Sequence, residues 1–131
     1  MPLAQGLVGE STVRVTEALT AARFASGLVA AFATPAMVGL MESAAVEATR
    51  THLAPGDTTV GIDVHIKHLA ATPVGMLVRA RAELVGVDGR RLDFRVEAWD
   101  EAEKIGEGTH TRMIVNEARF KERCEKKVPQ S

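Results

Sequence analysis

The hydrophobic pattern of the chain is dominated by one stretch, residues 34–53, with the sequence TPAMVGLMESAAVEATRTHL. Its early turns carry apolar side chains in every direction, which is typical of a helix buried in a membrane or in the middle of a domain. The stretch predicts a helix of about five turns. Thr34 is expected to be the N-cap, with Pro35 at the first helical position. The sequence APGD at positions 54–57 cannot continue a helix and predicts its end.

Alternation of apolar and polar residues with a period of two marks most of the remaining chain and predicts strands. The predicted strands are residues 11–19, 58–70, 76–87, 90–100 and 104–116. Asp-Gly at positions 88–89 predicts a two-residue hairpin. Residues 20–33 fit a short helix, a loop or a lid, and residues 117–128 predict a charged, helical tail.

The predicted order is therefore a strand, a helix and four strands in an antiparallel meander. A helix without a polar face needs apolar cover on most sides, and antiparallel strands can supply it by curling around the helix. This predicts the α+β class and the hot-dog fold, a curved antiparallel five-stranded sheet wrapped around one long central helix. We expect one domain over residues 1–131, with an N-terminal extension at 1–10 and a charged C-terminal tail at 117–131.

Composition narrows the classes of function. A net charge of −1 offers no electrostatic case for a nucleic-acid partner or for binding to an anionic membrane. No stretch reaches the ~18 apolar residues of a membrane span, and the N-terminus lacks the pattern of a signal peptide, so we expect a cytoplasmic protein. The single cysteine, Cys124, excludes a disulfide framework and a multi-thiolate metal site. We expect neither a bound metal nor a separate cofactor.

Glu42 is the one carboxylate within the apolar turns of the predicted helix. A buried ionisable group must be paired or have its pKa shifted, which makes Glu42 a functional-site candidate. No basic residue on the helix can pair with it, because the neighbours three and four positions away are Val38, Gly39, Ala45 and Val46. The alternative is that the helix is less buried and that Glu42 points to solvent.

His68 ends a row of residues on the apolar face of the second predicted strand. The earlier members of that row, counted by twos, are Ile62, Val64 and Ile66. His68 should therefore face the helix that carries Glu42. A carboxylate and an imidazole that meet across a helix–sheet contact form a general acid/base or a nucleophile/acid unit. The alternative is a core or rim histidine with its hydrogen bonds satisfied.

Three glycines and one arginine within the strand patterns are further candidates. Gly61, Gly106 and Gly108 indicate either bulges and tight bends or the close approach of a ligand to the backbone. Arg112 fits a ligand contact and a solvated side chain equally well, because the mixed pattern of its strand does not show which face is buried.

Four segments together resemble the hot-dog thioesterases of the fluoroacetyl-CoA thioesterase type. They are TPAMVGLMESAAVEA, GIDVHIKHLAATPVGMLVRARAEL, VDGRRLDFRVEAWD and EKIGEGTHTRMIV, and the resemblance runs from about residue 32 to residue 115. In that family a threonine at the helix start, a glutamate on the helix and a histidine on the following strand form the catalytic set. The resemblance thus implies catalytic roles for Thr34, Glu42 and His68.

The same resemblance implies substrate-binding residues. Gly61 and Arg112 match the glycine and arginine that line the acyl end of the family's pocket. Phe32 is a further substrate-binding candidate, since the region before the helix holds only Phe24 and Phe32 as aromatic residues. The fluoroacetyl-specific member has an aromatic-rich lid there, whereas this chain has GLVAA at positions 27–31.

The implied function is hydrolysis of an acyl-CoA thioester with a small acyl group, giving free acid and coenzyme A. Coenzyme A then enters as part of the substrate, and its pantetheine arm is expected to reach the site along a homodimer interface. Dimers of dimers are a further option. Glu42 would be the nucleophile or the base for water, and His68 would protonate the departing thiolate. A non-catalytic acyl-CoA binding or sensing domain is the main alternative, and a hot-dog hydratase or dehydratase is a lesser one.

Overall fold

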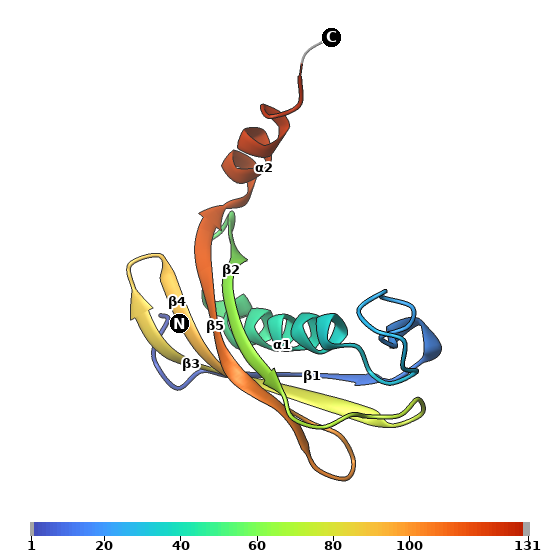
Figure 1. Cartoon of the computed structure of the whole chain (residues 1–131). Helices are drawn as coiled ribbons and strands as arrows, with labels where there is room; N and C mark the ends of the chain where they lie inside the picture. Colours follow the sequence, from blue (N-terminus) through green and yellow to red (C-terminus); the bar gives the residue numbers. More distant parts are fainter. Residues whose placement is uncertain (1, 130–131) are drawn as a thin grey trace.

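A computed structural model of the chain describes residues 2–129. Figure 1 shows a strongly curled sheet that holds the long helix α1 on its concave side, while the C-terminal helix α2 projects away from the sheet. This confirms the predicted α+β class and the curved five-stranded sheet around one helix. The elements are β1 (Val8–Arg14), the 3-10 helix η1 (Glu17–Leu19), α1 (Thr34–Thr49), the 3-10 helix η2 (Arg50–His52), β2 (Asp57–His68), β3 (Leu77–Asp88), β4 (Arg91–Trp99), β5 (Lys104–Asn116) and α2 (Glu117–Glu125).

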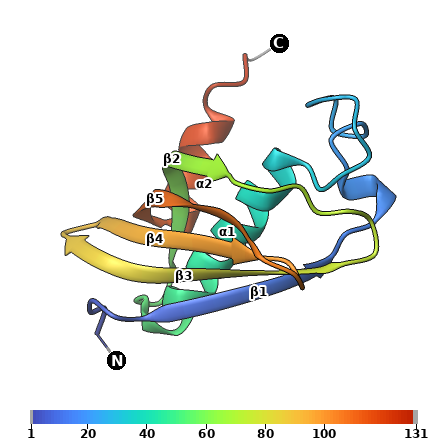
Figure 2. The ribbon, with the colours of Figure 1, turned by 60° about the horizontal axis from the view of Figure 1, so that its bottom comes forward.

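The strand order is β1-β3-β4-β5-β2, and every neighbouring pair is antiparallel (Figure 2). Strands β3, β4 and β5 form the predicted meander, but the prediction that β2 belongs to it was wrong. The reason lies in residues 69–76, which run to the end of β1 instead of forming a tight turn. There the N–H of Gly75 donates to the carbonyl of Val15, and the N–H of Val15 donates to the carbonyl of Met76. Strand β2 is consequently an edge of the sheet.

Residues 20–33 form neither a helix nor a strand but a loop that folds back on itself. The N–H of Ala21 donates to the carbonyl of Ala31 at 2.8 Å, and Thr20 and Phe32 are buried where the loop begins and ends. The first strand also lies earlier than predicted, at Val8–Arg14, because the alternation beyond it belongs to the extended lead into η1. The long helix ends as an α-helix at Thr49 and continues to His52 only as the tighter η2.

One side of α1 packs tightly against the sheet. The buried residues of the helix are Met37, Met41, Ala44, Ala45, Ala48 and Thr49. Gly9 of β1 has no room for a side chain, because an added Cβ would collide with the backbone oxygen of Ala44. A Cβ on Gly106 of β5 would lie 2.5 Å from the sulfur of Met37. Small residues on both elements therefore let the helix sit close to the sheet.

The opposite side of α1 is uncovered in the single chain, so the prediction of a helix buried all round was wrong. Gly39, Ser43 and Val46 are exposed there, and the Glu42 side chain is 40% exposed. The sheet curls around one side only, since β2 is its last strand on that flank. Within residues 2–129 no helix is long and apolar enough to cross a membrane.

Candidate active site

Thr34 and His68 form one polar pair at the start of α1. The Thr34 hydroxyl oxygen lies 2.7 Å from Nδ1 of His68. The expectation that Thr34 is the N-cap was wrong: Ala33 is the N-cap, and no side chain caps the helix start. As the first residue of the helix, Thr34 directs its hydroxyl to the strand β2 instead of to its own backbone. The tertiary hydrogen bond to His68 has replaced the local one that the sequence rule favours.

His68 faces α1, as the strand parity predicted. It pairs with Gly106 of β5, the residue that touches Met37 of the helix. Burial lowers the pKa of His68 below its ordinary value of 6.5, so the imidazole is neutral at neutral pH. Its Nε2 is buried and has no hydrogen-bond partner among residues 2–129. A pocket of about 410 Å³ opens beside this pair, and its lining includes Phe32, Thr34 and His68.

Glu42 and Arg112 form a second polar pair farther along α1. Nη1 of Arg112 lies 3.4 Å from Oε2 of Glu42. Arg112 is only 6% exposed, so the reading of it as a solvated residue was wrong. Its Nε donates to the Thr59 hydroxyl at 2.9 Å, and its Nη2 donates to the Thr59 carbonyl at 3.0 Å. The partner that Glu42 lacks on its own helix thus comes from β5.

Gly61 stands directly beside this second pair. An added Cβ would lie 2.6 Å from Oε2 of Glu42 and 3.2 Å from Nη1 of Arg112. The register of β2 against β5 shifts between Gly61 and Asp63, so a bulge is present as well. Ile62 sits in that bulge and is 56% exposed, and it therefore leaves the inward row to which the alternation assigned it.

The other two candidate glycines serve packing. Gly106 makes room for Met37 of α1, as described above. Gly108 faces the backbone of β2, and a Cβ there would collide with the carbonyl oxygen of His65. The close approach at these two positions is therefore made by the chain itself, whereas at Gly61 the neighbours are polar groups of the candidate site.

His110 is a residue of this site that the sequence argument did not select. It is 2% exposed and belongs to β5, which has β2 on one side and β4 on the other. Its Nδ1 is 2.8 Å from the carbonyl oxygen of Asp63, and its Nε2 is 3.1 Å from Nη1 of Arg112. The only signal in the sequence is its spacing, because residues two apart on a strand share one face, and His110 is two before Arg112.

The structure thus brings the candidate residues together as two pairs instead of one set. Thr34 and Glu42 are eight positions apart on α1, which corresponds to about 12 Å along the helix axis. Within residues 2–129 no hydrogen bond or ion pair joins Glu42 to Thr34 or His68. Both pairs lie where α1 faces β2 and β5, at the border of the helix surface that the sheet leaves uncovered.

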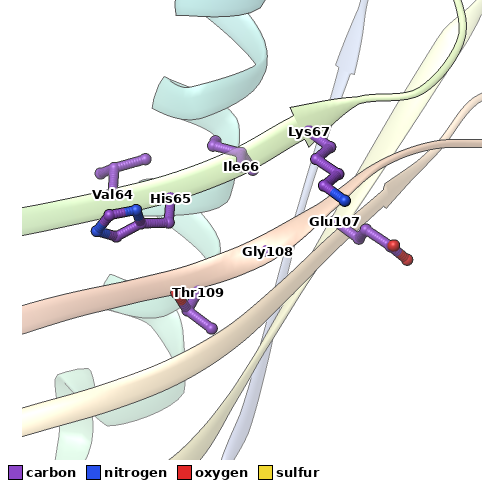
Figure 3. Close-up of a pocket in the computed structure, with 7 residues that line it drawn as sticks. All are labelled: Val64, His65, Ile66, Lys67, Glu107, Gly108 and Thr109. Carbon is purple, nitrogen blue, oxygen red and sulfur yellow. The ribbon is translucent and has the colours of Figure 1, made fainter.

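A larger groove of about 520 Å³ lies elsewhere, at the β2–β5 edge of the sheet (Figure 3). Its lining residues are Val64, His65, Ile66, Lys67, Glu107, Gly108 and Thr109. His65 and Lys67 project from the face of β2 opposite to His68, and Nε2 of His65 lies 3.1 Å from Oδ1 of Asp63. None of the candidate catalytic groups lines this groove, so its size alone does not make it the active site.

Comparison with known proteins shows which family this chain resembles in sequence and in structure. The family of fluoroacetyl-CoA-specific thioesterases matches residues 15–118. The fluoroacetyl-CoA thioesterase of Streptantibioticus cattleyicolor is 45% identical over 98 residues, which cover 75% of this chain and 70% of the relative. The solved structure of the fluoroacetyl-CoA thioesterase FlK is similar with a TM-score of 0.92 and 35% identity, over 98% of this chain and 100% of that chain. A hot-dog-like protein from Thermanaerovibrio acidaminovorans shares the fold with a TM-score of 0.86 at 21% identity, over 97% of this chain and 94% of that chain.

The curled sheet around one helix is the hot-dog fold, and the likeness to FlK places the chain among the hot-dog thioesterases. The chain belongs to the family of fluoroacetyl-CoA-specific thioesterases. By that membership it is an enzyme, a thioester hydrolase, which confirms the class of activity that the sequence resemblance implied.

Proposed function

We propose that this protein hydrolyses acyl-CoA thioesters with small acyl groups, and that Thr34, Glu42 and His68 are its catalytic residues. The observation that carries the proposal is the placement of these residues where α1 faces β2, at the border of the uncovered helix surface, with the Thr34–His68 hydrogen bond at the pocket beside the loop 20–33. FlK and the Streptantibioticus relative are named for fluoroacetyl-CoA. The loop of this chain carries only Phe24 and Phe32 as aromatic residues, and the panel of thioesters described below identifies the acyl group.

In the proposed reaction Glu42 attacks the thioester carbonyl or activates a water molecule for the attack. In the water route Glu42 orients the water, the neutral His68 takes a proton from it as the C–O bond forms, and the imidazolium gives that proton to the thiolate of coenzyme A as the C–S bond breaks. In the nucleophile route the C–S bond breaks as an acyl–Glu42 anhydride forms, and His68 then takes a proton from the water that hydrolyses the anhydride and gives it to the thiolate. The Thr34 hydroxyl orients the imidazole through Nδ1. Free backbone N–H groups at the start of α1 would stabilise the oxyanion, a contribution of roughly 3–4 kcal/mol per donor.

Arg112 and Gly61 bound the acyl end of this site in the proposal. Arg112 supplies a buried positive charge beside Glu42, and the missing side chain of Gly61 lets both groups lie close to the β2 backbone. A small acyl group suits this end of the site because the room there is limited: a single carbon added at Gly61 would already lie 2.6 Å from Oε2 of Glu42.

We further propose that the enzyme is a homodimer joined through β2. This strand is an edge of the sheet and exposes Ile62 and Val64, and a long apolar edge invites pairing with another strand. In an antiparallel pair of β2 strands, the half that carries Gly61 lies beside the half of the other copy that carries His68. Glu42 of the partner subunit would then approach the Thr34–His68 pair, and the pantetheine arm would enter along the interface.

Mixing two inactive variants tests this shared site. If Glu42 and His68 act across the interface, a dimer of one Glu42→Gln chain and one His68→Ala chain contains one intact site. Activity should therefore return after the two variants are mixed and allowed to exchange subunits. No recovery in a mixture that mass spectrometry shows to hold mixed dimers would mean that each site uses one chain, and a monomer at micromolar concentration would exclude the dimer.

The proposed setting is the cytoplasm, with the chain acting as one hot-dog domain. Cys124 is a free and exposed thiol, which suits a reducing compartment. Fractionation of the native cells with a membrane-associated and a secreted marker checks this location, and recovery of the protein with the secreted marker would contradict it.

A panel of acyl-CoA thioesters of graded length and polarity tests the activity directly, with kcat/KM measured for each. We expect hydrolysis of at least one short acyl-CoA and a loss of about 1,000-fold or more in His68→Ala. His65→Ala is the matched control, because His65 lies on the opposite face of the same strand, and it should keep full activity. Saturable binding of the esters without any hydrolysis would favour an acyl-CoA binding domain instead.

A further inference from the structure

We propose that His110 is a positioning residue, whose neutral imidazole with the proton on Nδ1 holds the Arg112 guanidinium in place beside Glu42. His110 touches neither the Thr34–His68 pair nor the pocket beside it, and its hydrogen bond to the site goes to Arg112, although its Cε1 also borders Gly61. The inference rests on the proposed thioesterase function, because the consequence for turnover runs through Glu42.

The two hydrogen bonds of His110 each determine where its proton lies. A guanidinium group has donors and no acceptor, so Nη1 of Arg112, at 3.1 Å, must donate to Nε2 of His110. Nε2 therefore carries a lone pair. The carbonyl oxygen of Asp63, at 2.8 Å from Nδ1, can only accept, so Nδ1 must carry the hydrogen. The two partners come from different strands and require the same tautomer.

The Arg112 guanidinium depends on this imidazole to hold its Nη1 side in place. Its Nε and Nη2 both donate to Thr59, which holds that edge of the guanidinium against β2. Nη1 is left with two contacts, the 3.1 Å bond to His110 and the longer 3.4 Å contact with Glu42. Because the Glu42 side chain is 40% exposed, it cannot by itself hold the buried guanidinium still. His110 is the rigid partner of the pair.

His110 is itself held firmly enough to act as that partner. Its ring stacks on Phe94 of β4, with the ring centroids 6.2 Å apart and an angle of 29° between the planes. Its Nδ1 is bonded to Asp63, the residue that follows the bulge of β2. The support therefore runs from the β2 bulge through His110 to Arg112 and from there to Glu42.

The charges around His110 favour the neutral form. Burial is the largest effect and lowers the pKa of His110 below its ordinary value of 6.5, and the positive charge of Arg112 lowers it further. The carbonyl of Asp63 and the carboxylates of Glu42 and Asp63 raise the pKa without reversing the direction. Protonation would remove the acceptor at Nε2 and would place a second cation against Arg112, so the positioning should fail at low pH.

Two amide substitutions separate the two hydrogen bonds. In His110→Asn the short amide can still donate to the Asp63 carbonyl but cannot reach Arg112. In His110→Gln the longer side chain can place its oxygen where Nε2 stood and accept from Arg112. We expect kcat to fall by about 10- to 100-fold in His110→Asn with little change in KM, and to be largely restored in His110→Gln. Thr111→Val is the control, since Thr111 binds Asp93 on the other face of β5, and it should leave kcat unchanged.

The pH profile of kcat gives a second reading. In the wild-type enzyme the fall of activity on the acid side should include the protonation of His110 as well as that of His68. In His110→Gln the first of these is absent, so the fall should be less steep. Equal kcat values for the Asn and Gln variants, with an unchanged acid side of the profile, would overturn the positioning role.

The tautomer can be read without any enzymatic activity. Long-range ¹H–¹⁵N correlation spectra of the wild-type protein, with His110→Gln used for assignment among the four histidines, report which ring nitrogen carries the proton. We expect a neutral ring protonated at Nδ1. A ring protonated at Nε2 would overturn the inference even if the thioesterase assay succeeds, and the expected tautomer would stand even if no acyl-CoA is hydrolysed.

Discussion

On one side of α1, Met37, Ala44 and Ala48 are buried against the sheet, and the strand glycines that face them have no room for a Cβ. On the other side, Gly39, Ser43 and Val46 are exposed. The two sides are made of similar residues, and both are largely apolar. They differ in their neighbours: the closed side meets backbone and core side chains, and the open side carries polar groups whose partners come from β2 and β5. One helix therefore holds the fold together along one side and offers the candidate site along the other.

The comparison also shows two ways in which a glycine can be required. Gly9 faces backbone atoms of α1, which cannot move without displacing the helix. Gly61 faces the end of the Glu42 side chain, which can turn away, whereas the His110 and Arg112 atoms at 3.1 and 3.2 Å from an added Cβ need to give only a few tenths of an ångström. A carbon added to the closed side should thus damage the fold, and a carbon added to the open side should damage the reaction.

Gly9→Ala should produce the largest loss of stability. Its Cβ would collide with the carbonyl oxygen of Ala44 and with the backbone nitrogen of Ala48, and no side-chain rotation relieves either contact. We expect the free energy of unfolding to fall by about 3 kcal/mol or more, since overpacking against backbone exceeds the usual cost. Urea denaturation measures this. Gly86→Ala is the control, because a Cβ there lies 3.5 Å from Asp93, an ordinary contact, and a similar loss in both variants would erase the distinction between the two kinds of glycine.

Gly61→Ala should leave stability nearly unchanged and lower activity. The added Cβ would lie 2.6 Å from Oε2 of Glu42, whose side chain is 40% exposed and can move outward. A shift of about 1 Å in a reacting group can cost about 100-fold, so we expect kcat/KM to drop by about that factor while the free energy of unfolding changes by less than about 1 kcal/mol. Parallel kinetic and denaturation measurements separate the two effects. A large loss of stability with intact activity per folded molecule would place Gly61 with the packing glycines.

The dependence of stability on pH should be the smallest of these effects. Because burial lowers the pKa of His110 in the folded protein, the unfolded chain binds more protons just below the ordinary value of 6.5. Stability should therefore be complete above about pH 6.5 and fall as the pH decreases, by at most about 1.4 kcal/mol per pH unit from this residue, until the folded-state pKa is passed. Denaturation of the wild type and of His110→Gln between about pH 8 and about pH 5 measures the difference. His65→Gln is the control variant, because His65 is exposed. If the free energy of unfolding depends on pH equally steeply in His110→Gln and His65→Gln, the effect of His110 is contradicted.

Local rules predicted much of this fold from the sequence. The bounds of β5 were predicted to the residue, and the inward direction of His68 followed from strand parity, because the bulge of β2 lies before Val64 and leaves the later alternation intact. The Asp-Gly hairpin was also confirmed, shifted by one residue, since Asp88 pairs with Arg91 and Gly89 adopts a φ of 60° in the turn.

Contacts between segments that are far apart in the sequence could not be predicted in the same way. The alternation of β2 is equally compatible with pairing to β3 or to β5, and only the path of residues 69–76 decides between them. An apolar helix surface shows a need for cover but not whether the same chain supplies it, so the open side of α1 was missed. His110 and the partner of Glu42 were missed for a related reason, because their hydrogen bonds join strands that are far apart in the sequence.

The central claim is that the open side of α1 is where acyl-CoA thioesters are hydrolysed and that Glu42 is the carboxylate that does it. The most direct test is kcat/KM of Glu42→Gln and of Glu47→Gln on the best acyl-CoA substrate. Glu47 is a carboxylate of the same helix that pairs with Arg50 at the surface, so its removal controls for charge. We expect Glu42→Gln to lose about 1,000-fold or more while Glu47→Gln matches the wild type. Equal activity in the two folded variants would contradict the claim.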